Sequence, residues 1–243
     1  MSVLVVTGTG TGVGKTVVTA ALAALACARG EKVAVVKPAQ TGVAPGEPGD
    51  LDEVRRLAGI HDTHELARFP DPLSPEAAAR AAGLPPLDLH AAARQVRALA
   101  ASRDRVLVEG AGGLLVRYDP AGATLADLAR AVAATVLVVT APGLGTLNHT
   151  ALTLEALAAR RLPLAGLVIG SWPGQPGMAE RSNLADLASL AGAALSGVLP
   201  EGAARLDRAA FGCLAAEGLA SPLGGRFDPA VFREKNTLVK ELM

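Results

Sequence analysis

The residues from Thr7 to Thr16, TGTGTGVGKT, follow the apolar run 3–6 and carry the strongest chemical signal in the chain. Glycines at every second position from 8 to 14 let the backbone turn sharply and direct several N–H groups inward. Lys15 supplies a cation for the β and γ phosphates of a nucleotide, and the Thr16 hydroxyl is suited to a Mg²⁺ shell. We therefore predict a phosphate-binding loop; the competing interpretation is an ordinary glycine-rich turn.

Charged residues also stand where two other apolar runs end. Lys37 follows the run 32–36, and Glu109 follows the run 105–108 within LVEGAGG. In a parallel sheet, ligands bind beyond the C-terminal ends of the strands, so both side chains are predicted to face the glycine-rich loop. Lys37 would then be an active-site cation, and Glu109 a Mg²⁺ ligand or a support for one. The competing interpretation makes each a solvated strand end or cap.

Asp50 and Asp52 lie in the loop that follows Lys37, next to a stretch rich in Pro and Gly at 44–49. Either carboxylate is suited to complete a Mg²⁺ shell, and either is suited to cap the helix predicted to begin near Leu51. The sequence leaves both interpretations open.

Short apolar runs alternate with helical patterns through most of the chain, which predicts an α/β fold. Strands are expected at 3–6, 32–36, 105–108, 135–140, 165–169 and 196–199. Helices are expected at 17–29, 87–101, 125–133, 147–160, 178–190 and 203–216. Because each crossover between parallel strands needs a helix, we predict a doubly wound, mostly parallel sheet with helices on both faces, like that of P-loop NTPases.

The composition sets limits on size and partners. The 243 residues suit one α/β domain spanning 1–243, with 221–243 as a cap or partly mobile extension where the alternation is lost. A formal net charge of +0 and 2% aromatic residues give no basis for nucleic-acid binding. Cys27 and Cys213 have neither disulfide-framework nor metal-site spacing. No apolar stretch reaches the ~18 residues of a membrane span, so we expect a cytoplasmic protein without a membrane partner.

Taken together, these motifs resemble those of the dethiobiotin synthetases, ATP-dependent enzymes of biotin biosynthesis. The likeness extends to about Pro200 and rests on TGTGTGVGKT, VKPAQTG at 36–42, Asp50, LVEGAGG at 107–113 and LGTLNH at 144–149. A generic P-loop has four residues between its first Gly and its Gly-Lys pair. Five residues separate Gly8 from Gly14 here, which is the spacing of this family.

The resemblance implies a reaction. It implies that 7,8-diaminononanoate takes up CO₂, supplied as CO₂ or bicarbonate, as a carbamate on one amine. ATP would phosphorylate this carbamate, and the second amine would close the ring of dethiobiotin and expel phosphate. The resemblance further implies Mg²⁺ beside ATP, and a homodimer with the site at the subunit interface.

The same resemblance assigns roles to individual residues. The implied catalytic residues are Lys37, Lys15 and Thr11, and the implied Mg²⁺ ligands are Thr16, Asp50 and Glu109. Nucleotide contacts fall on Gly12, Val13, Gly14, Lys15, Thr16, Val17, Glu109, Gly170, Pro200, Glu201 and Gly202. Substrate contacts fall on Thr41, Gly112, Leu147 and Asn148, where Asn148 belongs to the carboxylate pocket of the neighbouring subunit. Asn148 also stands near a predicted helix start, where a plain N-cap is the alternative.

The chain departs from some family members on the nucleotide side. Gly12 stands where those members carry an acidic residue, and IGSWP at 169–173 replaces a segment with Asn and Asp. In those members the Asn reads the adenine edge, and Gly170 has no side chain to do so. We therefore expect weaker discrimination between ATP and other nucleoside triphosphates, with the backbone at 200–202 still available to the base.

Other nucleotide-binding classes are alternatives. A regulatory or partitioning ATPase usually carries a second lysine early in the loop, where this chain has Gly10. An amide synthase of the cobyrinic-acid type needs a fused glutaminase, for which the chain has no room. A module that only senses ATP would leave Lys37, Asp50 and Glu109 without a role.

Overall fold

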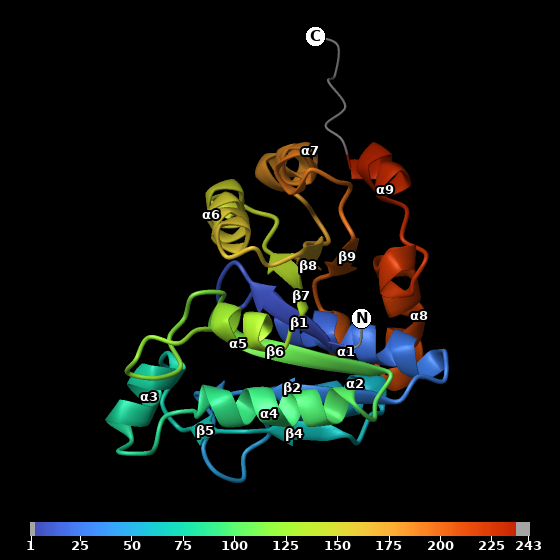
Figure 1. The fold of residues 1–243 in the computed structure, drawn as a ribbon. Coiled ribbons are helices and arrows are strands. Elements are labelled where there is room, and N and C mark those ends of the chain that lie inside the picture. The colour runs from blue at the N-terminus through green and yellow to red at the C-terminus, as the bar shows by residue number, and fades with distance from the viewer. Residues whose placement is uncertain (1–2, 237–243) are drawn as a thin grey trace.

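A parallel sheet forms the centre of the molecule in the computed structural model, which describes residues 3–236 (Figure 1). Every strand pair in it is parallel. Its strand order is β4 (Thr63–Glu65), β2 (Val33–Lys37), β6 (Arg105–Gly113), β1 (Val3–Gly8), β7 (Thr135–Thr140), β8 (Leu164–Trp172) and β9 (Gly197–Pro200). The predicted doubly wound α/β fold is confirmed, and each predicted strand lies within a few residues of an observed one.

Alternation along the strands divides the core into two layers. In β1, Val3 and Val5 face one layer, while Leu4 and Val6 face the other. The second layer is closed by α1 (Lys15–Ala28), α2 (Asp50–Ala58) and α8 (Arg208–Gly218). The first is closed by α4 (Leu89–Ala100), α5 (Leu125–Ala131), α6 (Thr146–Ala159) and α7 (Met178–Ala191). Burial on both faces explains why the strands are continuous apolar runs.

Some elements were not predicted from the sequence. The edge strand β4 has three residues, and β3 (Gln40–Thr41) pairs with β5 (Arg68–Phe69) in a separate small sheet. Helix α3 (Pro75–Ala81) spans only seven residues. Such short elements contain too few residues to show a hydrophobic period.

The helix predicted at 203–216 begins later than expected. Residues Ala203–Arg205 form a 3₁₀ turn, and Leu206 is extended. Asp207 then caps α8, because its carboxylate accepts a hydrogen bond of 2.9 Å from Ala210 N. A side-chain cap of this kind defines where a helix starts, which an apolar pattern alone does not show.

Beyond Ser221 the described residues form two helical elements and no further strand. A 3₁₀ turn spans Ser221–Leu223, and α9 spans Pro229–Asn236. Phe232 of α9 packs edge-on against Trp172 with the ring centroids 5.3 Å apart. The segment therefore packs against the C-terminal end of β8, the neighbour of the edge strand β9. Residues 237–243 lie outside the described residues.

Within 3–236, no helix combines the length and the apolar character required to cross a bilayer.

Candidate functional site

The glycine-rich loop joins β1 to α1 and is shaped by two left-handed residues. Gly12 has φ +75° and Gly14 has φ +95°, a conformation that side chains other than glycine rarely adopt. Gly14 is the N-cap residue of α1, and Lys15 is the first residue of that helix. The N–H groups at the start of this 14-residue helix point into the loop, which suits an anion.

The end of β8 presses against this loop. A Cβ at Gly170 would lie 2.1 Å from Val13 O, and one at Gly14 would lie 2.5 Å from Gly170 O. No side chain fits in either place without moving backbone. The main chain of Gly170 therefore packs directly against the main chain of the loop at Val13 and Gly14.

Lys37 and Glu109 meet because of strand register. β6 lies between β2 and β1, with Val108 opposite Val36 and Glu109 opposite Val6. Lys37 Nζ consequently donates to Glu109 Oε1 at 2.8 Å, and both side chains are buried. The interpretation of either residue as a solvated strand end is thus wrong.

Asp50 and Asp52 have separate roles. Asp50 Oδ2 lies 2.5 Å from Lys37 Nζ, whereas Asp52 Oδ2 accepts from Gly49 N at 2.7 Å and closes the start of α2. Gln40 helps to place Asp50, because its Oε1 accepts from Asp50 N at 2.9 Å. The sequence offered no signal for Gln40 beyond its place in VKPAQTG.

The charges of this cluster influence one another. Burial by itself would lower the pKa of Lys37, but the Glu109 and then the Asp50 carboxylate outweigh it, so that pKa is raised and the ammonium stays protonated. The pKa of Lys15 is lowered to about 8, chiefly by burial and then by the Lys37 ammonium, although Glu109 and Asp50 oppose the shift. Lys15 Nζ donates to Gly10 O at 2.9 Å.

The same residues fit a divalent cation. Thr16 Oγ1 donates to Glu109 Oε1 at 2.9 Å, so the hydroxyl and the carboxylate lie together as expected for shared ligands. Among the described residues Glu109 Oε2 is buried without a hydrogen-bond partner, which leaves an acceptor for a cation. Residues 3–236 contain no group of three or more His, Cys, Asp or Glu side chains able to hold a metal. A Mg²⁺ ion would therefore take its other ligands from phosphate oxygens and water.

A cavity of about 590 Å³ opens over this cluster. Most of the sequence-predicted residues for the reaction line it: Thr11, Gly12, Gly14, Lys15, Thr16, Val17, Lys37, Thr41, Asp50, Glu109 and Gly112. Residues 72–75, which lead into the first residue of α3, form part of the wall and were missed, because they carry no charged group. Tyr118 was missed as well; its buried hydroxyl accepts from Ala111 N at 3.0 Å and supports the strand end that carries Glu109.

Other predicted residues lie outside this cavity. Leu147 and Asn148 are on the first turn of α6, next to a second hollow of about 460 Å³ lined by the loop, by 112–116 and by α6. The N-cap of α6 is Gly145, so the interpretation of Asn148 as a cap is wrong. At the end of β9, Glu201 N donates to Trp172 O at 2.7 Å, which ties the turn 200–202 to the end of β8.

The sheet order, the loop on a helix N-terminus and the buried Lys–Glu pair define a P-loop nucleotide-binding protein. Solved structures share the fold alone. A chain of the MinC:MinD cell division complex of Aquifex aeolicus has a TM-score of 0.53 at 17% identity, covering 97% of this chain and 90% of that one. Chloroplast FtsY from Physcomitrella patens has a TM-score of 0.51 at 18% identity, and the match covers 88% of this chain and 65% of that one.

Sequence relatives define the family. Residues 2–205 match a family model described as an AAA domain. A protein of Frankia casuarinae named ATP-dependent dethiobiotin synthetase BioD is 64% identical over 97% of this chain and 99% of its own length. A protein of the same name from Streptomyces avermitilis is 58% identical over 96% of this chain and 98% of its own length. The chain belongs to the dethiobiotin synthetase family.

The lowered pKa of Lys15 predicts proton uptake when a nucleotide binds. Above pH 8 the free protein holds Lys15 mostly neutral, and phosphate charge next to the amine raises its pKa again. Calorimetry of MgADP binding at pH 8.5, in two buffers of different ionisation heat, should show uptake of roughly half a proton or more. The affinity should fall as the pH rises from 8 to 10.

Lys15→Arg is the matched control for this measurement. Arginine remains charged across this pH range, so the variant should bind without net proton uptake. Equal uptake by the variant and the parent protein would show that another group titrates.

Proposed function

We propose that the protein is a dethiobiotin synthetase that works in the cytoplasm, where ATP is supplied. The proposal rests on its family membership and on one observation. Two lysines and two carboxylates, from the end of β2, from β6 and from the first residues of α1 and α2, converge beside the phosphate loop. Phosphoryl transfer needs positioning and charge neutralisation more than covalent chemistry, and this cluster provides both.

The chemistry proceeds without a covalent intermediate between the substrate and the enzyme. One amine of 7,8-diaminononanoate adds to CO₂ and loses a proton to give a carbamate. A carbamate oxygen attacks the γ-phosphorus of ATP, and ADP leaves. The second amine then attacks the carbonyl carbon of the mixed anhydride, its N–H proton is lost, and the C–O bond breaks to release inorganic phosphate. A new C–N bond closes the ring.

Each reacting group has a residue suited to it. Lys15 neutralises the transferring phosphoryl group, and the N–H groups of 12–17 bind the phosphates. Lys37 stabilises the carbamate and its anhydride, while the hydroxyls of Thr11 and Thr41 are available to the same group. All four side chains come from residues that line the one cavity, which supports this division of roles.

The contacts of Lys37 indicate how it reaches the substrate. An ammonium has three donors, and here they go to Glu109 Oε1, Asp50 Oδ2 and, more weakly at 3.3 Å, Gly110 O. A carbamate can be bound only if one donor is released. Asp50 gives way most readily, because 35% of its side chain is exposed and water can replace the lost contact.

Thr16, Asp50 and Glu109 would hold Mg²⁺. When bound, the ion supplies positive charge to the phosphate oxygens as the negative charge moves towards ADP. The unpaired Glu109 Oε2 and the partly exposed Asp50 carboxylate provide acceptors that Lys37 does not fill.

We also propose a homodimer. Leu144 is 92% exposed just before α6, and Leu115 and Leu152 are exposed at the second hollow. This apolar surface adjoins Asn148, which lies outside the main cavity of its own chain. A second copy would cover the leucines and bring Asn148 to the carboxylate end of the substrate.

Turnover tests the function directly. Incubation with MgATP and 7,8-diaminononanoate should give dethiobiotin by mass spectrometry only when bicarbonate is added. Lys37→Ala should abolish product formation, because the carbamate loses its cation, while ATP affinity changes little. Product without bicarbonate would exclude the proposed chemistry, and undiminished turnover by Lys37→Ala would exclude its role.

Nucleotide selectivity is expected to be weak. Gly170 offers no side chain to the base, and a side chain there would strike Val13 O. In competition binding, the dissociation constants of ATP, CTP and GTP should differ by less than about tenfold, or about 1.4 kcal/mol in binding free energy. A large preference for ATP would show that the backbone at 200–202 reads adenine by itself.

The mass in solution tests the dimer. Light scattering should give twice the chain mass of 24.4 kDa. Leu144→Asp, which places a charge in the buried contact, should shift the equilibrium towards the monomer and raise the KM for the diamine. A monomeric parent protein with full turnover would contradict the proposal.

A further inference from the structure

A network of buried threonine hydroxyls lies beneath the phosphate loop, apart from the groups assigned to the reaction. Thr140, the last residue of β7, is fully buried. Its Oγ1 lies 2.7 Å from Thr146 Oγ1, 2.9 Å from Thr150 Oγ1 and 3.3 Å from Thr9 Oγ1. Thr146 and Thr150 are four residues apart and share one face of α6, while Thr9 belongs to the loop.

Donor counting gives this network a direction. Each hydroxyl has a single proton. Thr146 donates its proton to Ala141 O at 2.5 Å, so it must accept the proton of Thr140. Thr140 Oγ1 also lies 3.5 Å from Ala141 O, but its single proton goes to the closer Thr146 oxygen. It then accepts from Thr150 and from Thr9. The hydroxyl of Thr140 is therefore the point through which the loop and α6 are joined.

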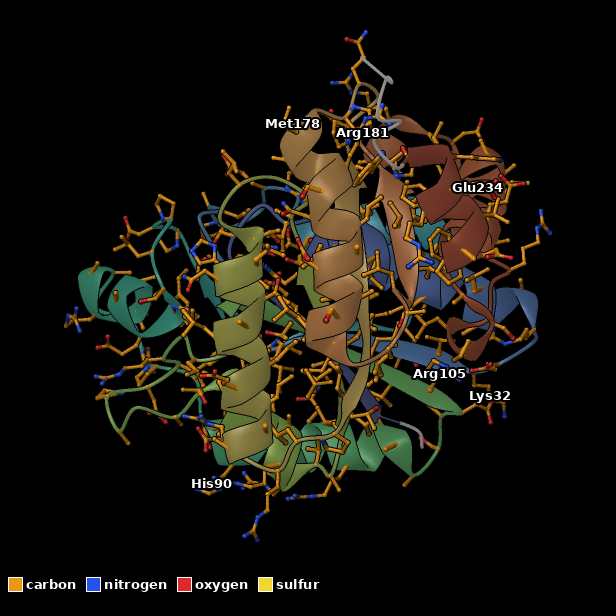
Figure 2. The ribbon with its side chains drawn as sticks, turned by 90° about the horizontal axis from the view of Figure 1, so that it is seen from above. Lys32, His90, Arg105, Met178, Arg181 and Glu234 are labelled. Atoms are coloured by element: carbon orange, nitrogen blue, oxygen red, sulfur yellow. The ribbon has the colours of Figure 1, made fainter. Side chains whose placement is uncertain are left out.

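The connection between β7 and α6 is held from both sides. On one side Thr146 bonds Ala141 O. On the other, Asn183 Nδ2 of α7 donates to Pro142 O at 2.8 Å and to Gly143 O at 3.1 Å. Figure 2 shows α6 and α7 side by side, so the two anchors come from neighbouring helices. These bonds hold residues 141–143, which lead into the first turn of α6.

The loop end of the network is also tied to β7. Thr9 N donates to Val139 O at 2.9 Å, and its hydroxyl meets Thr140 Oγ1 at the longest distance in the network. Thr9 is partly exposed, whereas Thr140 and Thr150 are fully buried and Thr146 nearly so. The Thr9 contact is the one that movement of the loop would strengthen or break.

We propose that Thr140 is a positioning residue that fixes the first turn of α6 to the phosphate loop. Through it, nucleotide bound at 12–17 orders the turn that presents Leu147 and Asn148. The consequence for diamine binding rests on the proposed function, because those two residues are assigned to the substrate carboxylate. The mechanical link itself does not depend on that assignment.

The link is tested first without the reaction. MgADP should slow amide hydrogen exchange in the loop and also in residues 141–150 of the parent protein. In Thr140→Val, which keeps the shape but removes the hydroxyl, only the loop should respond. Thr140→Ser should restore the response. An equal response in Thr140→Val, or no response of 141–150 in the parent protein, would overturn the inference.

Thr153→Val is the matched control. Thr153 lies on the same helix, but within residues 3–236 its hydroxyl bonds only to His149 O of that helix, at 2.8 Å. This variant should behave as the parent protein. If Thr140→Val does not fold, Thr9→Val removes the loop end of the link and leaves the buried hydroxyls paired. It should lose the response of 141–150 in the same way.

Turnover gives the second readout. Thr140→Val should raise the KM for 7,8-diaminononanoate about fivefold, the effect of one lost hydrogen bond, with kcat and ATP affinity nearly unchanged. A fall in kcat alone, with KM unaltered, would contradict a positioning role. A parent protein that makes no dethiobiotin would defeat the proposed function, and the exchange result would still decide the link.

Discussion

Lys37 and Glu109 form a buried ion pair at adjacent strand ends, and the organisation of the site depends on it. Charges removed from water destabilise a fold unless they are paired with good geometry, and here the 2.8 Å contact and Asp50 provide the pairing. The same cluster keeps Lys37 protonated and holds Glu109 against Thr16. Folding thus brings these charges together beside the phosphate loop.

Strand order explains why this cluster lies beside the phosphate loop. β6 separates β2 from β1, so Glu109 stands between the lysine of one neighbour and the loop of the other. Parallel strands bring all three ends to one edge, and the 14-residue α1 directs its N-terminus to the same place. Lys37 and Thr16 of the phosphate loop therefore meet at a single carboxylate, that of Glu109.

The fold does not by itself specify this reaction. A chain of the MinC:MinD complex of Aquifex aeolicus shares the sheet and helices at 17% identity, yet that complex is a cell division protein complex. The chemistry belongs to side chains placed on the common scaffold. In this chain the side chains that we propose for this role are Lys37, Asp50 and Glu109, together with Thr16 of the loop.

Periodic apolar runs and the spacing of glycines determined the sheet, its main helices and the phosphate loop, because these signals are local in the chain. The sequence predicted only that Lys37 and Glu109 lie at the same edge of the sheet. Their direct contact depends on the register between β2 and β6. Which aspartate faces the site, the late start of α8, the packing of α9 on Trp172 and the threonine network were decided by tertiary structure. The start of α8 depends on a local side-chain cap, which the spacing of apolar residues does not reveal. The other features depend on hydrogen bonds or packing between residues distant in sequence, and such contacts form only when the layers of the fold come together.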